Sequence, residues 1–461
     1  MVSLSLLTLL LSAYKSGIGI NFDSIMFISC AQNLASGKGL HMYNGAPLLY
    51  WPPLYPIMLS VLLITGLHYP EATFLLNLFF FSALTLIFTL YLRKILGKNP
   101  LFYPLSLLIF SLPILKIYTR ALSEAPFVLF VFLFLVLAER YKLQPRGGSL
   151  RLLSAVSVLS SLSRYIGAFT FPIVSALIWM KEGKKTKAFF WGLLSTLPLA
   201  LWFLRNYLIS HTLAGRREVV SKPLWDKLYK IFHLLLYRWF SPVEPLAPLF
   251  FLLWILILGA AIYRAFSSRA VKEKLIVPIL LLSSYFFFLL LSFLYSEFPQ
   301  KAFPRFLAPL FPVFLILLAL SLREISTTQG LKRAVLIFVL LFTLSHLYVS
   351  TKEVLKYFQS GITPASNLKN SALITYIKRH SLPGPIFCNS PPVLYLYTGR
   401  SSLFIPRRGR SLSPLKKRGR TLIWFKNLGE RKRYSLREIR WRVKLLKVFS
   451  CRKGKIFLIE N

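Results

Sequence analysis

Apolar runs alternate with short polar or basic segments along the first 350 residues. The runs lie near 2–20, 53–67, 72–96, 101–119, 124–141, 151–180, 188–208, 246–266, 274–296, 304–322 and 332–350. A helix needs about 17–25 apolar residues to cross a bilayer, so the pattern predicts a polytopic membrane protein with about 10–12 apolar helices. The first run has neither a basic segment before it nor a small-residue cleavage site, so we expect it to be retained as a span.

Basic residues cluster in five loops between these runs. The loops lie near 93–98, 140–151, 181–187, 264–274 and 323–333. Basic loops stay in the cytoplasm, which leaves 21–52 as the first outer loop. On this topology the segment 151–180 must enter the membrane and return to the same side, as two short helices broken around Ser163-Arg164. The run 53–67 is then expected to be a short re-entrant element that does not cross the membrane, because a full crossing there would move the basic loops to the outer side.

Composition supports the membrane class and adds a strong positive charge. Hydrophobic residues make up 55% of the 461, and mean hydropathy is +0.59, which excludes soluble and fibrous proteins. Lys and Arg number 57 against 15 Asp and Glu. The excess beyond the basic loops lies towards the C-terminus and indicates contact with anionic lipid headgroups or phosphates. Nucleic acid is disfavoured, because the basic region follows many membrane spans.

After a transmembrane domain over 1–350, the sequence pattern from 351 to 461 predicts a small extracytoplasmic α/β domain. We expect strands at 385–388, 421–425 and 455–459, and a helix at 370–380. The three cysteines show no metal-binding spacing, and a disulfide between Cys388 and Cys451 stays open. We therefore expect an α-helical membrane protein with a second, mixed α/β part.

Two acidic residues on the outer side are candidates for chemistry. Asp23 follows the first apolar run and could be the N-cap of a helix over 24–36, or a general base at the water–lipid boundary. Glu124 begins a span, where the helix dipole favours an acid. It is also a candidate second carboxylate that orients an acceptor or helps to hold a metal. A single acid leaves the need for a divalent metal undecided.

Arginines at the ends of spans are candidate phosphate ligands, because a guanidinium can bind phosphate through two hydrogen bonds. Arg164 interrupts an apolar run and Arg305 begins one. The alternative for Arg164 is a side chain that extends to the membrane surface. Arg216 is similar, although ordinary surface charge explains it equally well. The segment from Trp51 to Pro56 is either an interfacial aromatic belt or part of a substrate groove.

In their order and spacing these residues resemble the dolichyl-phosphate-mannose-protein mannosyltransferase-like family. This family belongs to the GT-C glycosyltransferases and is related to protein O-mannosyltransferase and the aminoarabinose transferase. The resemblance covers about residues 15–405. It rests on Asp23, the run 31–40, Trp51-Pro52-Pro53-Leu54-Tyr55-Pro56, Ser123-Glu124, Ser163-Arg164-Tyr165-Ile166-Gly167, Trp202-Phe203-Leu204-Arg205-Asn206, Gly215-Arg216, Arg305-Phe306-Leu307-Ala308-Pro309 and Cys388-Asn389-Ser390-Pro391.

The resemblance implies a plasma-membrane enzyme that moves a sugar from a polyprenyl-phosphate carrier to a protein, lipid or glycan acceptor on the extracytoplasmic face. The implied roles are a catalytic pair, ligands of the donor phosphate and a substrate groove. The residues are Asp23 and Glu124 for the pair, Arg164, Arg305, Arg216 and Lys38 for the phosphate, and Trp51, Tyr55 and Tyr165 for the groove.

The sequence departs from the family at two places. Many members have a second acid beside the first, whereas Asn21, Phe22 and Ser24 flank Asp23 here. Many also have a lysine before the Pro-Pro pair, where this chain has Trp51; Lys38 is a candidate replacement.

The residues fit this chemistry independently of the resemblance. A lipid phosphate leaving group needs cations, and direct displacement needs a base and inverts the anomeric centre. The alternative from another class is a membrane transporter or lipid flippase, with ionisable residues along a substrate path. Transporters often contain paired repeats, and no internal repeat is visible in this chain. A membrane scaffold that binds anionic lipid is a third interpretation, but it leaves the Asp23 segment without a role.

Overall fold

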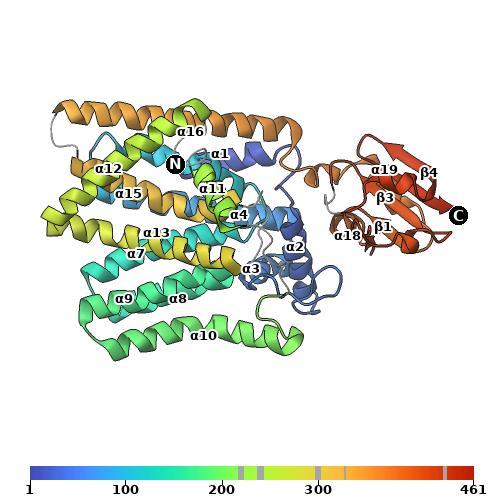
Figure 1. Ribbon diagram of the computed structural model, residues 1–461, viewed down its shortest axis with the longest axis horizontal. Helices are drawn as coiled ribbons and strands as arrows, with labels where there is room; N and C mark the ends of the chain where they lie inside the picture. The colour runs from blue at the N-terminus through green and yellow to red at the C-terminus, as the bar shows by residue number, and fades with distance from the viewer. Residues whose placement is uncertain (216–222, 236–242, 296–302, 326–328, 429–432, 461) are drawn as a thin grey trace. The chain divides into compact units, whose positions relative to one another are not determined.

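The computed structural model spans residues 1–461, and the structure describes all of them except 216–222, 236–242, 296–302, 326–328, 429–432 and 461. The chain forms two compact units. The first unit contains Met1–Leu10, Leu48–Tyr55 and Leu75–Leu355, and the second contains Leu11–Pro47, Pro56–Phe74 and Lys356–Asn461. Figure 1 follows the chain from the blue N-terminal helices to the red C-terminal strands.

Six stretches in the described ranges are long and apolar enough to cross a bilayer, which confirms a polytopic helical membrane protein. They are α4 (Tyr69–Leu96), α10 (Lys185–Ser210), α12 (Ala247–Ser267), α13 (Arg269–Tyr295), α16 (Gln329–Ser360) and Arg305–Ile325, which contains α14 (Phe303–Leu307) in part, η6 (Ala308–Leu310) and α15 (Phe311–Ile325). Two other apolar helices, α1 (Val2–Ala13) and α3 (Leu54–Ile64), are shorter. With 11 residues α3 is about 16 Å long, which suits the short element expected at 53–67.

The apolar run 101–119 does not form one helix, contrary to the expectation of a single apolar element there. It forms α5 (Phe102–Leu107), η1 (Leu108–Phe110) and α6 (Leu112–Tyr118). Ser111 has an extended backbone, with φ −67° and ψ 157°, and Pro113 follows in the first turn of α6. Proline is tolerated in a first turn and not in a helix interior, so a new helix begins here.

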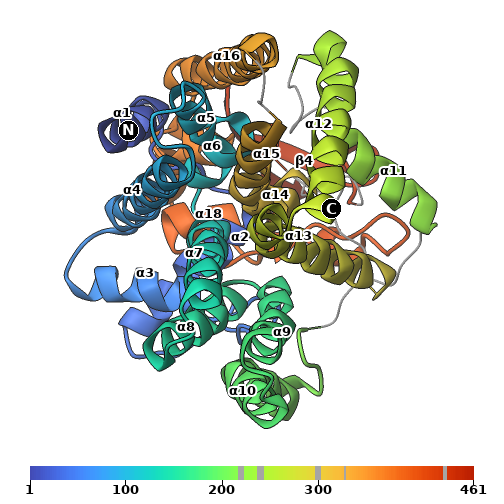
Figure 2. The ribbon, with the colours of Figure 1, turned by 90° about the vertical axis from the view of Figure 1, so that its left-hand side faces the viewer.

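The predicted break around Ser163-Arg164 is confirmed. The chain runs from α7 (Glu124–Leu143) through α8 (Gly147–Ser163), η2 (Tyr165–Phe169) and α9 (Thr170–Glu182). Arg164 is extended, with φ −150° and ψ 134°, and ends α8. A Cβ at Gly167 would lie 2.4 Å from the carbonyl carbon and oxygen of Ser160, so only glycine lets η2 approach α8 this closely. As a result α8 and α9 lie side by side, next to α7 and α10 (Figure 2).

The second unit contains a five-stranded sheet with the order β2-β1-β3-β5-β4. Strand β1 pairs parallel with β2 and β3, whereas β5 pairs antiparallel with β3 and β4. Besides most of α3 and the start of α4, its elements are α2 (Phe22–Ala35), η7 (Ser366–Leu368), α17 (Ala372–Arg379), β1 (Ile386–Cys388), α18 (Pro391–Thr398), β2 (Leu403–Phe404), η8 (Ser413–Leu415), β3 (Thr421–Phe425), α19 (Leu436–Arg440), β4 (Lys444–Cys451) and β5 (Gly454–Glu460). The three expected strands and the expected helix are confirmed; β2, β4, α18 and α19 were not predicted.

Segments from both ends of the chain share one hydrophobic core in the second unit. Ile20 and Ile25 pack in the same cluster as Leu373, Leu394 and Ile423. Another cluster contains Phe387, Leu422 and Phe457. These three residues are adjacent in sequence to Cys388, Ile423 and Ile456 of the first cluster. Because successive strand residues point to opposite faces, the two clusters cover the two faces of the sheet. The segment around α2 is therefore built into the fold of the C-terminal domain.

One helix boundary is corrected, and the open question of a disulfide is answered. Helix α16 continues to Ser360, ten residues beyond the run that ended at 350. The cysteines are free, so no disulfide joins Cys388 and Cys451. Cys388 ends β1 and Cys451 ends β4, and the strands β3 and β5 lie between them. Three strand spacings put the two about 14 Å apart, which is too far for a disulfide.

The remaining described elements of the first unit are α11 (Leu224–Leu235) and η4 (Glu244–Leu246).

Candidate active site

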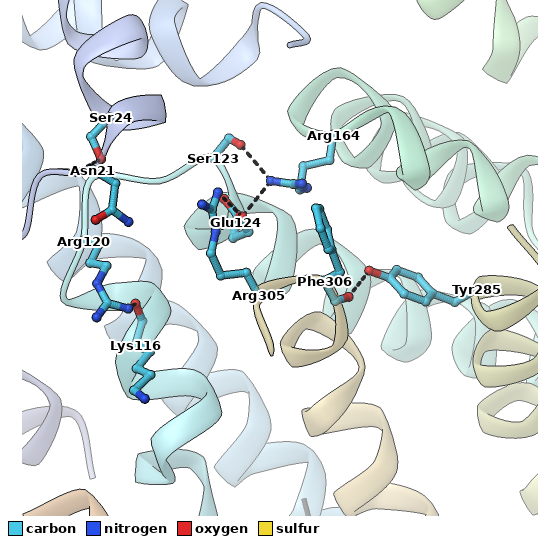
Figure 3. A network of polar contacts seen from close by, with 10 residues as sticks. All are labelled: Asn21, Ser24, Lys116, Arg120, Ser123, Glu124, Arg164, Tyr285, Arg305 and Phe306. Carbon is cyan, nitrogen blue, oxygen red and sulfur yellow. Dashed lines mark hydrogen bonds and ion pairs between the residues drawn. The ribbon is translucent and has the colours of Figure 1, made fainter. Parts of the chain in front are cut away.

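Three residues chosen from the sequence meet at one point of the first unit: Glu124, Arg164 and Arg305 (Figure 3). Glu124 is the first residue of α7 and is fully buried. Its Oε1 lies 2.8 Å from Nη1 of Arg164 and 2.6 Å from Nη2 of Arg305. Nε of Arg305 also donates to this oxygen over 2.7 Å. We refer to these three residues as the Glu124 cluster.

Neighbouring groups hold the two guanidinium groups in place. Nη1 of Arg164 donates to Oγ of Ser123 over 3.5 Å, and its guanidinium lies 5.2 Å from the ring centre of Phe306. Tyr285 donates a hydrogen bond to the carbonyl of Phe306, the residue after Arg305. A cation over an aromatic face is stabilised by the quadrupole of the ring. The arginines are thereby positioned by helices α8, α13 and α14 around one carboxylate.

The Glu124 cluster is positively charged and partly open. One carboxylate faces two guanidinium groups, whose side chains keep 14% and 17% of their surface exposed. Within the described residues, Nε and Nη2 of Arg164 make no hydrogen bond, and neither does the buried Oε2 of Glu124. Buried charged groups are stable only when they are paired and hydrogen-bonded. The arrangement can thus receive an anion at Arg164 and a hydroxyl donor at Glu124.

The predicted groove residues lie in the first unit, around the segment Leu48–Tyr55. The hydroxyl of Tyr165 donates to the carbonyl of Leu49 over 2.8 Å and accepts from Nε1 of Trp202 over 2.9 Å. Nη1 of Arg205 donates to the carbonyl of Leu48 over 2.8 Å. These contacts fix the chain just before the Trp-Pro-Pro run. Within that run, Trp51 is half-buried and Tyr55 is fully buried.

Asp23 lies in the second unit, in the first turn of α2. The interpretation of Asp23 as an N-cap is wrong, because α2 begins at Phe22 and Asn21 is its cap. The backbone N–H of Asn21 donates to Oγ of Ser24 over 3.0 Å in a capping box. Asp23 is half-buried and comes two residues after the cap, so the capping requirement does not explain it.

The other two predicted phosphate ligands are Lys38 and Arg216. Lys38 is exposed, in the turn after α2 in the second unit, and its carbonyl is hydrogen-bonded by Nδ1 of His41. Arg216 lies outside the described residues. The structure therefore brings together Glu124, Arg164 and Arg305, with Trp51, Tyr55 and Tyr165 in the same unit.

Several residues around these positions were not predicted to have a role. Ser123 and Phe306 contact Arg164, and each is a sequence neighbour of a predicted residue. Trp202 and Arg205 belong to the motif at 202–206, but the sequence assigned neither residue to the site. Nδ2 of Asn77 donates to the carbonyls of Tyr118 and Arg120 and fixes the chain before Ser123; nothing in the sequence distinguishes this asparagine.

The donor atoms do not fit a divalent metal at the Glu124 cluster. Two guanidinium groups already bind Oε1 of the carboxylate, and cations would repel a metal ion there. Across the described ranges, no group of three or more His, Cys, Asp or Glu side chains lies close enough to hold a metal ion.

The fold of the chain is similar to that of two solved structures. The chain is similar to ArnT from Cupriavidus metallidurans in the apo state, with a TM-score of 0.63 and 14% identity, over 99% of this chain and 96% of that one. It is equally similar to the same ArnT bound to undecaprenyl phosphate, with a TM-score of 0.63 and 13% identity over the same shares. No protein-family model and no curated protein sequence matches the chain.

Proposed function

We propose that this protein is an integral-membrane glycosyltransferase that takes a sugar from a polyprenyl-phosphate carrier. The fold is that of ArnT, which has been crystallised with undecaprenyl phosphate. The more specific assignment, to the mannosyltransferase-like branch, rests on the sequence motifs from Asp23 to Asn389. We further propose that the protein resides in the plasma membrane and acts on its extracytoplasmic face, with a protein, lipid or glycan as the acceptor.

The observation that carries this proposal is the Glu124 cluster. A carrier phosphate gains negative charge as the sugar leaves, and cations placed beside it stabilise that charge. Arg164 and Arg305 present two partly exposed guanidinium groups, fixed on one buried carboxylate. Because Glu124 already holds both arginines, their positions are set before the donor arrives. The free energy of ordering two long side chains is therefore not lost at the moment of transfer.

We assign the role of general base to Asp23. As the acceptor hydroxyl or amine attacks the anomeric carbon, its proton passes to the Asp23 carboxylate. The bond between the anomeric carbon and the phosphate oxygen breaks, and both bonding electrons leave with the carrier phosphate. Direct displacement of this kind inverts the anomeric centre and forms no covalent intermediate with the enzyme.

The geometry favours a positioning role for Glu124 over a second base. Oε1 is occupied by the two arginines, so a proton on this carboxylate would weaken both ion pairs. Oε2 can still accept a hydrogen bond from a hydroxyl of the sugar or the acceptor. Tyr165, Trp51 and Tyr55 would line the adjoining groove, since Tyr165 holds the segment that contains the other two.

The test is sugar transfer in membranes that contain the full-length protein, with a panel of radiolabelled polyprenyl-phosphate sugars. Asp226→Asn is a matched control for Asp23→Asn, because Asp226 is also an acid in the first turn of a helix and is exposed. We expect transfer by the wild type and by Asp226→Asn, and a loss of at least about a thousandfold in Asp23→Asn at equal expression.

Transfer by Asp23→Asn at the wild-type rate would exclude Asp23 as the base while leaving the enzyme class intact. No transfer by the wild type, with every common donor supplied, would contradict the glycosyltransferase and favour the transporter or flippase.

A further inference from the structure

The second unit contains a cavity of about 450 Å³, and none of the residues assigned above is among its lining residues. All of its lining residues belong to this unit. They come from three places: the turn after α1 with Lys15 and Ser16, the start of α4 with Tyr69, and the C-terminal domain with Lys369 and Lys453. The volume is that of a small-molecule site, and it exceeds what a single inorganic ion requires.

The lining is cationic. Lys15, Lys369 and Lys453 line the cavity, and no Asp or Glu is among its described lining residues. The acid closest in sequence is Glu71, which is exposed. Hydroxyl and amide side chains supply most of the other polar surface, including Ser360 and Asn370. Three ammonium groups with neutral hydrogen-bonding neighbours are suited to an anion with several acceptor oxygens, such as a phosphate ester.

The cavity lies at the ends of apolar helices. Lys15 comes two residues after α1, Tyr69 begins α4, and Ser360 ends α16. Helices α4 and α16 are among those long enough to cross a bilayer. The ends of such helices lie at the level of the lipid headgroups, where lysines meet phosphate.

Tight contacts keep the wall of the cavity in place without a ligand. Asn367 donates from Nδ2 to the carbonyl of Ser360 over 2.6 Å, and Ser366 donates to Oγ of Ser16 over 3.3 Å. Gly361 has φ +79°, and a Cβ there would lie 2.0 Å from Oδ1 of Asn367 and 2.8 Å from Oγ of Ser16. The wall of the cavity is therefore preformed, which lowers the entropy cost of binding.

We propose that this cavity binds a phosphate ester carried by a small headgroup, and that Lys15, Lys369 and Lys453 are its ligands. The source that suits the helix ends is an anionic phospholipid, and a soluble phosphate ester shares the same chemistry. The site shares no residue with the Glu124 cluster, and the proposal holds whether or not the protein transfers a sugar.

Native mass spectrometry of the purified full-length protein tests this site directly. The probes are dihexanoyl phosphatidylglycerol, dihexanoyl phosphatidylcholine as the neutral lipid, and glycerol phosphate as the soluble ester. The variant is Lys15→Gln/Lys369→Gln/Lys453→Gln. The matched control is Lys416→Gln/Lys417→Gln/Lys444→Gln, which removes the same charge from exposed positions of the same unit.

We expect the wild type and the control to retain phosphatidylglycerol over phosphatidylcholine, and the cavity variant to retain about tenfold less. If glycerol phosphate binds as well and is lost in the same variant, the ester comes from solution; if only the lipid binds, it comes from the membrane. Both results support the phosphate site. Equal retention by wild type and cavity variant, or an equal loss in the control, would overturn it.

A change in folding would be visible separately. Cys388 is buried in the same unit, so its protection from a thiol reagent reports whether the variant is folded. A folded cavity variant that still binds the probes contradicts the proposal. If the triple variant loses this protection, the single variants of Lys15, Lys369 and Lys453 are compared with the wild type instead. Each is expected to retain about threefold less phosphatidylglycerol.

Discussion

Thr363 and Ile20 form two hydrogen bonds with each other across 343 residues of sequence. Oγ1 of Thr363 accepts from the backbone N–H of Ile20 over 3.1 Å and donates to its carbonyl over 2.9 Å. Both residues lie in the second unit, and Ile20 immediately precedes Asn21, the cap of α2. One hydroxyl of the C-terminal domain thus fixes the backbone three residues before Asp23.

Replacement of Thr363 by valine keeps the shape of the side chain and removes this hydroxyl. Ile20 then has a buried N–H and C=O without their partner, so we expect a loss of about 1–3 kcal/mol in the stability of the second unit. The change is measured by thermal unfolding, with the reactivity of Cys388 towards a thiol reagent as the signal of unfolding. Thr375→Val is the control, because Thr375 is exposed and donates only to Ser371 of its own helix. An unchanged midpoint in Thr363→Val would show that the pair contributes nothing.

Glu124→Gln and Asp23→Asn should differ in stability as well as in activity. The glutamine leaves two partly buried guanidinium groups without their shared carboxylate, so we expect a loss of about 3–5 kcal/mol in Glu124→Gln. Asparagine has nearly the shape of aspartate, and Asp23 is only half-buried, so Asp23→Asn should lose less free energy of unfolding than Glu124→Gln. Thermal unfolding in detergent compares the two. Equal midpoints would mean that the Glu124 ion pairs do not stabilise the bundle.

Tyr165→Phe should loosen the segment before the Trp-Pro-Pro run. The hydroxyl of Tyr165 bonds both the carbonyl of Leu49 and the indole N–H of Trp202, and its removal should cost about 1–3 kcal/mol. Limited proteolysis between 44 and 51 should become faster. Tyr207→Phe is the control, because Tyr207 is 50% exposed. Equal proteolysis of Tyr165→Phe and the wild type would contradict the anchoring role.

The thiol of Cys388 should report on the pH dependence of the C-terminal domain. Burial raises the pKa of Cys388 to about 12, against 9.0 for an ordinary cysteine. The unfolded chain therefore loses the proton at lower pH than the folded chain. The stability linked to this thiol is complete below about pH 9 and declines as pH rises towards 12.

Maleimide labelling at pH 8, read peptide by peptide in a mass spectrometer, should modify the half-buried Cys451 before Cys388. Denaturant should make the two rates equal. Fast labelling of Cys388 in the native protein would contradict its burial.

Much of the architecture could be predicted because its signals are local. Apolar length predicted the long helices, and short runs of strand-forming residues predicted β1, β3 and β5. The break at Arg164 could be recognised because an arginine interrupts an otherwise apolar run. Strand β4 was not recognised: its pattern of lysines and apolar residues matches an exposed edge strand, whose half-buried face gives a weak signal.

The candidate site was predictable in its members and not in its geometry. Glu124, Arg164 and Arg305 were each chosen as ionisable residues at the end of a span, but nothing local shows that they share one oxygen atom. That relationship depends on the packing of three helices. The cap of α2 was misassigned for a similar reason: Asn21, Asp23 and Ser24 are all good capping residues, and only the backbone shows which one begins the helix.

The second unit is assembled from three stretches that are far apart in the order of synthesis. Residues 11–47 leave the ribosome first, yet the core that receives Ile20 and Ile25 needs strands that are made some four hundred residues later. Until translation ends, this early segment must remain at the membrane without its partner surface. Contacts between such distant parts form slowly, and exposed apolar surface in the meantime attracts chaperones and proteases. A ribosome that stopped after the last span would thus release a membrane bundle in which the Asp23 segment has no core to join.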